Sequence, residues 1–73
     1  MKDIDTNVFK SLLVYDAMDY SIVKQYIKKN NIRVNYEIND VFIIHTYSQD
    51  IYNQLKAFLK HVRIKHKNYK KED

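Results

Sequence analysis

Apolar and polar residues change their spacing along the chain, and the changes predict several separate elements. Between residues 20 and 29 the apolar residues recur at helical spacing on one face, while serine, glutamine and lysine side chains take the other. We expect an amphipathic helix from Tyr20 to Lys29. Asp19 is placed to cap its start, and Asn31 is placed to close its end where glycine is more usual.

The segment before this helix has a different pattern. Leu12 to Tyr15 is a continuous apolar run bounded by Ser11 and Asp16, which is typical of a short buried strand. A helix that begins near Thr6 is the alternative. A single helix through both segments is disfavoured because it would place aspartates within its apolar stripe.

A β-hairpin is predicted over residues 32–47. Residues 32–38 and 41–47 both alternate, and Asn39-Asp40 offers a two-residue turn between them. This register places Tyr36 opposite Ile43 on the face expected to meet the core.

A second helix follows Ser48, which is placed to cap it, with Asp50 in its first turn. Its expected buried stripe is Ile51, Tyr52, Leu55, Phe58, Leu59 and Val62. No turn residue follows Val62, so we expect the helix to continue beyond it. A short edge strand at residues 62–66 is the alternative.

These elements predict one domain over residues 1–73, with flexible ends at 1–6 and 67–73. The expected fold class is α/β in the α+β sense: a small two-layer βαββα sandwich with both helices on one face of an antiparallel sheet. This is a truncated ferredoxin-like arrangement that lacks its last strand. Replacing the first strand by a helix gives the alternative order, ααββα.

Composition excludes several classes of protein. Glycine, proline and cysteine are all absent, so disulfides, thiolate metal sites and the glycine-rich loops that bind nucleotide phosphates are excluded. No apolar run approaches the roughly 20 residues of a membrane span, and residues 1–6 contain no apolar signal core. We expect a cytoplasmic protein without a membrane partner. Ile, Lys, Asn and Tyr fill 34 of 73 positions, which indicates an AT-rich genome.

Charge is divided unevenly between the two ends of the chain. Residues 1–53 carry six Lys or Arg against seven Asp or Glu, whereas residues 54–73 carry seven against two. A segregated basic stretch is the electrostatic footprint of binding to a phosphate backbone or to an acidic protein surface. A solvated helix face and tail that keep the protein in solution are the alternative interpretation. The candidate nucleic-acid residues are Lys56, Lys60, Arg63, Lys65, Lys67, Lys70 and Lys71.

A second candidate surface lies on the sheet. If both helices cover one face, the predicted register leaves Phe42 and Ile44 on the other. An exposed apolar patch of this kind usually marks an interface. The candidate protein-interface residues are Phe42, Ile44, Arg33, Asn35 and Glu37, and the expected partner is another protein or a second copy of the chain.

Candidate catalytic and metal-binding groups are sparse. His45, Ser48 and Asp50 lie near one another in sequence, but His45 is expected in the core and the other two at a helix start. His61 and His66 are five residues apart, which is not the spacing of two metal ligands on a helix. We expect no catalytic residue, metal, cofactor or small-molecule substrate.

Asp16 and Asp19 follow the first strand, where paired carboxylates can hold Mg²⁺ for phosphodiester hydrolysis. Strand termination and helix capping explain the same two residues without a metal. A metal-dependent nuclease is therefore a third hypothesis.

The leading hypothesis is a non-enzymatic protein-binding accessory or regulatory module. Such a module, of the kind abundant in phage and mobile elements, would inhibit a larger host protein by occluding it. Seven tyrosines support this role because tyrosine is favoured at interfaces. The alternative is a nucleic-acid-binding protein without sequence preference that uses the basic C-terminal segment.

Overall fold

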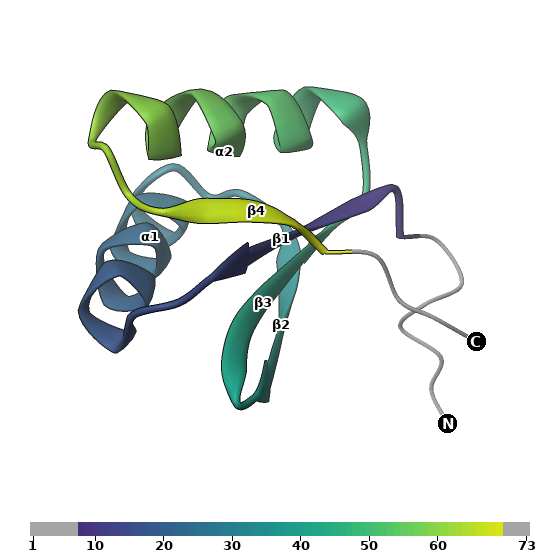
Figure 1. The fold of residues 1–73 in the computed structure, drawn as a ribbon. Coiled ribbons are helices and arrows are strands. Elements are labelled where there is room, and N and C mark those ends of the chain that lie inside the picture. Colours follow the sequence, from purple (N-terminus) through teal and green to yellow (C-terminus); the bar gives the residue numbers. More distant parts are fainter. Residues whose placement is uncertain (1–7, 70–73) are drawn as a thin grey trace.

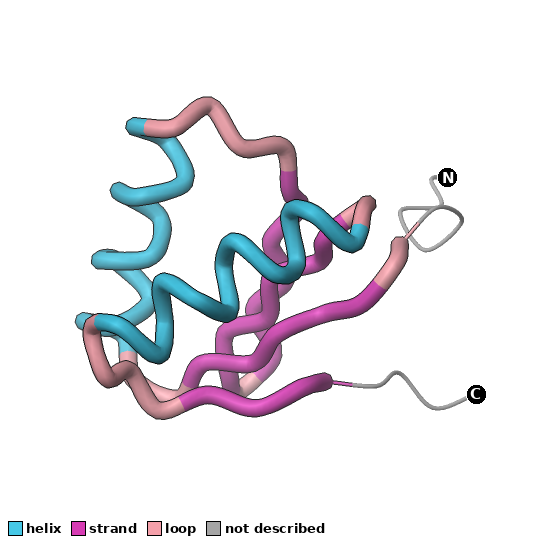
Figure 2. The backbone as a smooth tube through the Cα atoms, turned by 90° about the horizontal axis from the view of Figure 1, so that it is seen from above, coloured by secondary structure: helices cyan, strands magenta, loops and turns pink. Residues whose placement is uncertain are grey.

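The computed structural model describes residues 8–69 and shows a two-layer α+β domain. Its elements are β1 (Lys10–Val14), α1 (Ala17–Lys29), β2 (Val34–Asn39), β3 (Val41–Thr46), α2 (Gln49–His61) and β4 (His66–Tyr69). The four strands form an antiparallel sheet in the order β2-β3-β1-β4. Both helices lie on one face of this sheet (Figures 1 and 2).

The predicted two-layer sandwich is confirmed, and so is a strand rather than a helix at its start. The fourth strand is the main addition. β4 pairs with β1 and completes the ferredoxin-like order of elements, which was predicted without its last strand. Of the stretch 67–73, residues 67–69 belong to β4 and residues 70–73 lie outside the described residues, as do residues 1–6.

Helix α1 begins earlier than predicted. Asp16, not Asp19, is its N-cap: the Asp16 carboxylate accepts from the backbone N–H groups of Met18 and Asp19 at 3.2 and 3.4 Å. At the other end Asn31 takes a left-handed φ of 53°, as predicted, and Ile32 N–H donates to the carbonyl of Ile27 at 3.0 Å. This is a Schellman closure, which satisfies the last carbonyls of the helix.

Helix α2 ends in the same way, and the sequence prediction that it continues past Val62 is wrong. Arg63 takes a left-handed φ of 60°, and Ile64 N–H donates to the carbonyl of Leu59 at 2.9 Å. Ile64 is buried in the same core cluster as Leu59, as the apolar residue that accompanies this closure. The reversal turns the chain back along the sheet as β4.

The hairpin forms, but its register differs by one residue from the prediction. Asp40 alone stands between the strands with a left-handed φ of 69°, and Asn39 pairs with Val41. Tyr36 therefore faces Ile44 rather than Ile43. Because side chains alternate along a strand, this slip moves every β3 side chain to the other face of the sheet.

The core lies between the sheet and the helices. Its fully buried members come from four elements: Leu12 and Val14 of β1, Ile44 of β3, Val23 of α1, and Leu55 and Leu59 of α2. Burying each such side chain contributes about 1.5–3 kcal/mol to folding. Among the described residues, no helix is long and apolar enough to cross a membrane.

Replacing Arg63 with glycine should stabilise the fold. A left-handed conformation costs a residue with a Cβ about 1–2 kcal/mol, and the greater chain entropy of glycine cancels part of the gain. We expect Arg63→Gly to raise the free energy of unfolding in urea by about 0.5–1 kcal/mol. Arg63→Ala is the matched control, since it removes the same charge and keeps the Cβ. Equal stabilities of the two variants would contradict the argument.

Candidate functional site

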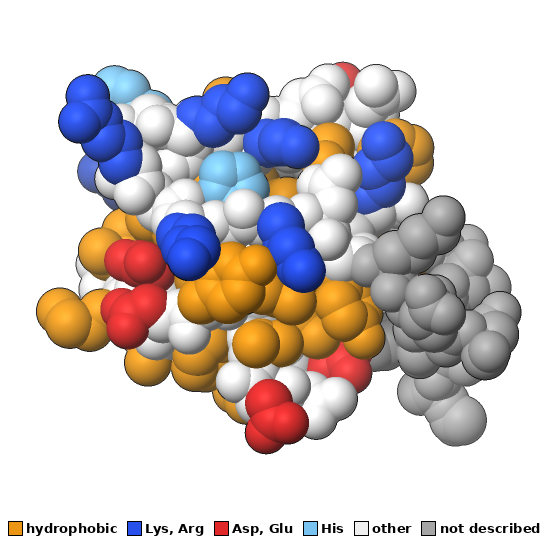
Figure 3. Space-filling view, in the orientation of Figure 1, with side chains coloured by type: hydrophobic (Ala, Val, Ile, Leu, Met, Phe, Trp, Pro, Cys, Tyr) orange, Lys and Arg blue, Asp and Glu red, His pale blue; other side chains and the backbone are white. Residues whose placement is uncertain are grey.

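The clearest concentration of charge covers helix α2 and strand β4. Figure 3 shows Lys and Arg side chains gathered over these two elements, with the visible Asp and Glu side chains outside the cluster. We call this surface the basic face; its predicted members within the described residues are Lys56, Lys60, Arg63, Lys65 and Lys67. None of them forms an ion pair with a described residue. Lys70 and Lys71 lie outside the described residues.

A chain of side-chain hydrogen bonds connects α2 to β4. Lys56 Nζ donates to the hydroxyl of Tyr52 at 3.2 Å, and that hydroxyl donates to Asn68 Oδ1 at 2.5 Å. The ammonium of Lys10 lies over the same tyrosine ring, 5.2 Å from its centre. Sequence reasoning missed Lys10 because it belongs to β1, far from the basic segment in the chain. The basic face is therefore drawn from both ends of the sequence.

An exposed aromatic ring lies within the basic face. Tyr15 directly follows β1 and is 42% exposed, and Lys65 Nζ lies 5.3 Å from the centre of its ring. Lys67 pairs with Leu13, so it lies on the face of the sheet that the helices leave uncovered. Ammonium groups beside an accessible ring can hold a phosphate chain and a stacked base together.

A groove lies at the opposite edge of the sheet, between α1 and β2. Its volume is about 570 Å³, and its walls include Tyr20, Lys24, Ile27, Lys28, Val34 and Tyr36. The two tyrosine rings meet edge to face at 5.9 Å. Lys24 Nζ lies 5.2 and 5.4 Å from their centres. The groove thus combines an aromatic wall with fixed positive charge.

Burial raises the pKa of Tyr20 above its usual 10.0. Burial also raises the pKa of Tyr36, and the nearby Tyr20 phenolate adds to that rise. Both phenols therefore stay protonated at neutral pH and are available as hydrogen-bond donors.

The uncovered face of the sheet carries a polar cluster that the sequence did not reveal. The ring of His45 lies between Ser11 Oγ, at 2.7 Å from Nδ1, and Glu37 Oε1, at 2.8 Å from Nε2. A carboxylate only accepts, so Nε2 carries a proton, and Nδ1 lies within hydrogen-bond distance of the serine hydroxyl.

Serine, histidine and glutamate are the residue types of a nucleophilic triad, but these side chains are poorly accessible. Ser11 is 5% exposed and His45 is 2% exposed, which leaves a substrate no approach to the hydroxyl. The cluster satisfies buried polar atoms instead. Its members come from three strands and lie up to 34 positions apart, so no local motif announces it.

The predicted protein-interface residues divide between two faces. Ile44 is fully buried in the core, and Phe42 packs against that core and stacks on Tyr20 at 4.5 Å. Their placement on the uncovered face was wrong, because the hairpin register is shifted by one residue. Asn35 and Glu37 do lie on the uncovered face.

At the end of that face, Asn35 donates a hydrogen bond to the hydroxyl of Tyr47. The guanidinium of Arg33 lies 6.0 Å from the centre of the same ring. These polar contacts, and not the predicted Phe42 and Ile44, occupy this part of the uncovered face.

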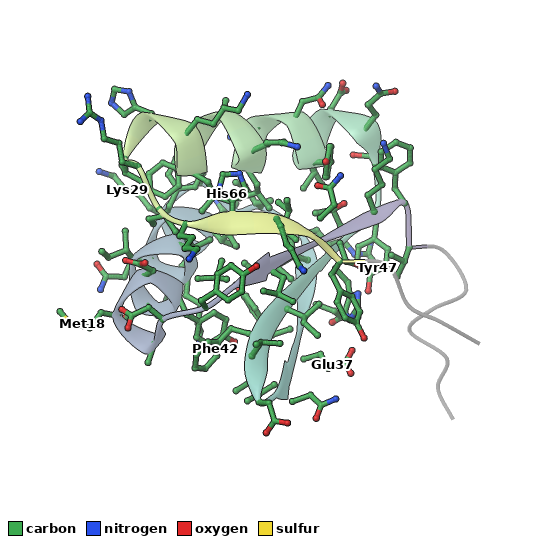
Figure 4. The ribbon with its side chains drawn as sticks, viewed as in Figure 1. Met18, Lys29, Glu37, Phe42, Tyr47 and His66 are labelled. Carbon is green, nitrogen blue, oxygen red and sulfur yellow. The ribbon has the colours of Figure 1, made fainter. Side chains whose placement is uncertain are left out.

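Three of the remaining candidate groups, His66, Ser48 and Asp16, have structural contacts. His66 lies on β4 beneath α2, with Nδ1 2.7 Å from the carbonyl of Ile64 (Figure 4). Ser48 caps α2 by accepting from Ile51 N–H at 3.2 Å, and Asp16 caps α1. No group of three or more His, Cys, Asp or Glu that could hold a metal ion is found among the described residues.

Ser11→Ala should destabilise the fold by about 1–3 kcal/mol, because it leaves the buried Nδ1 of His45 without its hydrogen-bond partner. Urea denaturation measures the loss. In a His45→Leu background the serine hydroxyl has already lost this partner, so Ser11→Ala should be neutral or stabilising there. The same loss in both backgrounds would show that the hydrogen bond contributes nothing.

Stability should fall at alkaline pH partly through Tyr20 and Tyr36. Both have a pKa above 10.0 in the folded state, so the unfolded chain releases these protons first as the pH rises. The stability that these two tyrosines contribute is fully present below about pH 10. It is lost as the pH rises through their pKa values in the folded state. Urea denaturation from about pH 8 to pH 11 should give a shallower decline for Tyr20→Phe than for the unaltered protein. Identical slopes would contradict this.

No family model, curated protein or solved structure matches the chain. The surfaces of the molecule therefore carry the evidence on its function.

Proposed function

We propose that this protein is a non-enzymatic module that binds single-stranded nucleic acid on its basic face without sequence preference. The observation that carries the proposal is the clustering of lysine and arginine over α2 and β4 without ion-pair partners among the described residues. Unpaired ammonium groups on one face attract a polyanion and release its counterions when it binds. A face whose positive charges were neutralised by neighbouring carboxylates would not attract a polyanion in this way.

Tyr15 favours a single strand over a duplex. Its ring is 42% exposed beside Lys65, so an unpaired base has an accessible surface on which to stack. Bases in a duplex are already stacked on one another and do not offer that contact. Stacking depends little on base identity, which agrees with a site that has few arginines to read base edges.

Two lysines of the basic face are held rather than freely extended, and this lowers the cost of binding. Lys56 is hydrogen-bonded to Tyr52, and Lys65 lies against Tyr15. Each lysine side chain that is already restricted loses less rotamer freedom when a phosphate binds. Strand β4 also matters, because its pairing with β1 places Lys67 opposite Leu13, on the same side of the sheet edge as Lys65 and Tyr15.

The test is binding of a labelled oligothymidylate, followed by fluorescence anisotropy at several salt concentrations. Lys65→Gln/Lys67→Gln should weaken binding and make it less sensitive to salt. The slope of log affinity against log salt should fall by about 0.7 for each phosphate that the variant no longer neutralises. Tyr15→Ala should cost about 1–3 kcal/mol of binding free energy.

Lys24→Gln/Lys28→Gln is the matched control. It also removes two positive charges, but from the groove at the other edge of the sheet. It should leave the affinity for the oligothymidylate nearly unchanged. Equal weakening by both pairs would mean that net charge alone drives binding, and the assigned face would be wrong.

A further inference from the structure

Strand β2 presents an unprotected edge. It is an outer strand of the sheet, and no described segment pairs with its free side. Native edge strands are usually guarded by charged side chains, especially lysine, by proline or by a bulge; Val34–Asn39 contains neither lysine nor proline, and its one charged side chain, Glu37, is paired with His45. Its outward N–H and C=O groups form a template for one more strand.

The side chains beside this edge are suited to a partner. Tyr36 is 38% exposed and Ile38 is 66% exposed, and both lie on the face of the sheet that carries the helices. The groove described above runs between β2 and α1, so alternate side chains of an added strand would enter it. The apolar residues Ile27 and Val34 form part of its wall.

The charge of the groove indicates what kind of strand fits. Lys24 and Lys28 line it, and no carboxylate of the described residues does. Lys24 is held over the rings of Tyr20 and Tyr36, so its ammonium is fixed beside the edge. An incoming segment with carboxylates on the groove side would place negative charge against both lysines.

We propose that the β2 edge and its groove bind an extended segment of another protein, in which acidic and apolar residues alternate, as a fifth strand of the sheet. A second copy of this chain fits less well. Two copies related by a twofold axis at β2 would bring the α1 groove faces together, and like-charged Lys24 and Lys28 would meet their counterparts.

This role lies beyond nucleic-acid binding and uses the other edge of the sheet. It assigns the protein-binding function expected from the sequence to β2 and α1 in place of Phe42 and Ile44. Because β2 and β4 are the two outer strands, the two ligands do not compete for one surface.

A fluorescein-labelled octapeptide of alternating glutamate and valine is the probe, with fluorescence anisotropy as the readout. Lys24→Glu/Lys28→Glu should weaken its binding by about tenfold or more, because two attractions become repulsions. Lys65→Glu/Lys67→Glu, the matched reversal on the basic face, should leave peptide affinity within about twofold. These variants separate the peptide site from the nucleic-acid site.

Two further peptides test strand addition itself. The same peptide N-methylated at alternate residues keeps every side chain but loses the donors of one edge, so it should bind about tenfold more weakly or not at all. A peptide of alternating lysine and valine should not bind.

Failure of the glutamate–valine peptide to bind, or binding that Lys24→Glu/Lys28→Glu does not weaken, would overturn the proposal. So would equal affinity for the N-methylated peptide. A dimeric mass in light scattering that Ile38→Lys converts to a monomeric one would assign the edge to a second copy instead.

Discussion

The hairpin register around Asp40 is the constraint on which the surfaces of this protein depend. Asp40 alone occupies the apex in a left-handed conformation, and this sets Asn39 against Val41. Shifted by one residue, β3 would turn His45 toward the helices and Ile44 away from them. The observed register instead buries Ile44 in the core and brings His45 between Ser11 and Glu37. Tyr36 faces the helices in either register, and here it lies opposite Ile44 and forms a wall of the groove.

Much of the fold could be predicted because its elements have local signals. The apolar run at Leu12, the helical spacing after Tyr20 and the cap at Ser48 each depend on neighbours within a few positions. Asn31 was recognised as a helix terminator for the same reason, since asparagine tolerates left-handed backbone. Arg63 performs the same task without that signal, so the end of α2 and the start of β4 were missed. Ile64, an apolar residue that is absent from the predicted buried stripe of the second helix, was the available sign of a Schellman closure.

The candidate sites were less predictable because they depend on contacts between distant segments. The lysines of the basic segment could be named from the charge distribution, but Lys10 and Tyr15 join them only because β4 pairs with β1. The groove requires α1 and β2 side by side. Phe42 and Ile44 show how one position of error at a turn exchanges an expected interface for part of the core. Alternation along a strand predicts two faces, and only the register decides which one is buried.

The absence of glycine places residues with side chains at the chain reversals, and one of these residues, Arg63, adds to the difference between the two edges of the sheet. Asn31, Asp40 and Arg63 supply all three left-handed positions among the described residues, and each carries a side chain that must remain exposed. Arg63 therefore adds a cation where α2 turns into β4, and the lysines that follow it protect that edge from pairing with another strand. The β2 edge has the opposite arrangement. Val34–Asn39 itself contains no lysine, whereas Lys24 and Lys28 lie on α1 beside this edge. At β4, positive charge on the strand itself disfavours the addition of another strand. At β2, positive charge beside the strand favours an added strand that carries acidic side chains.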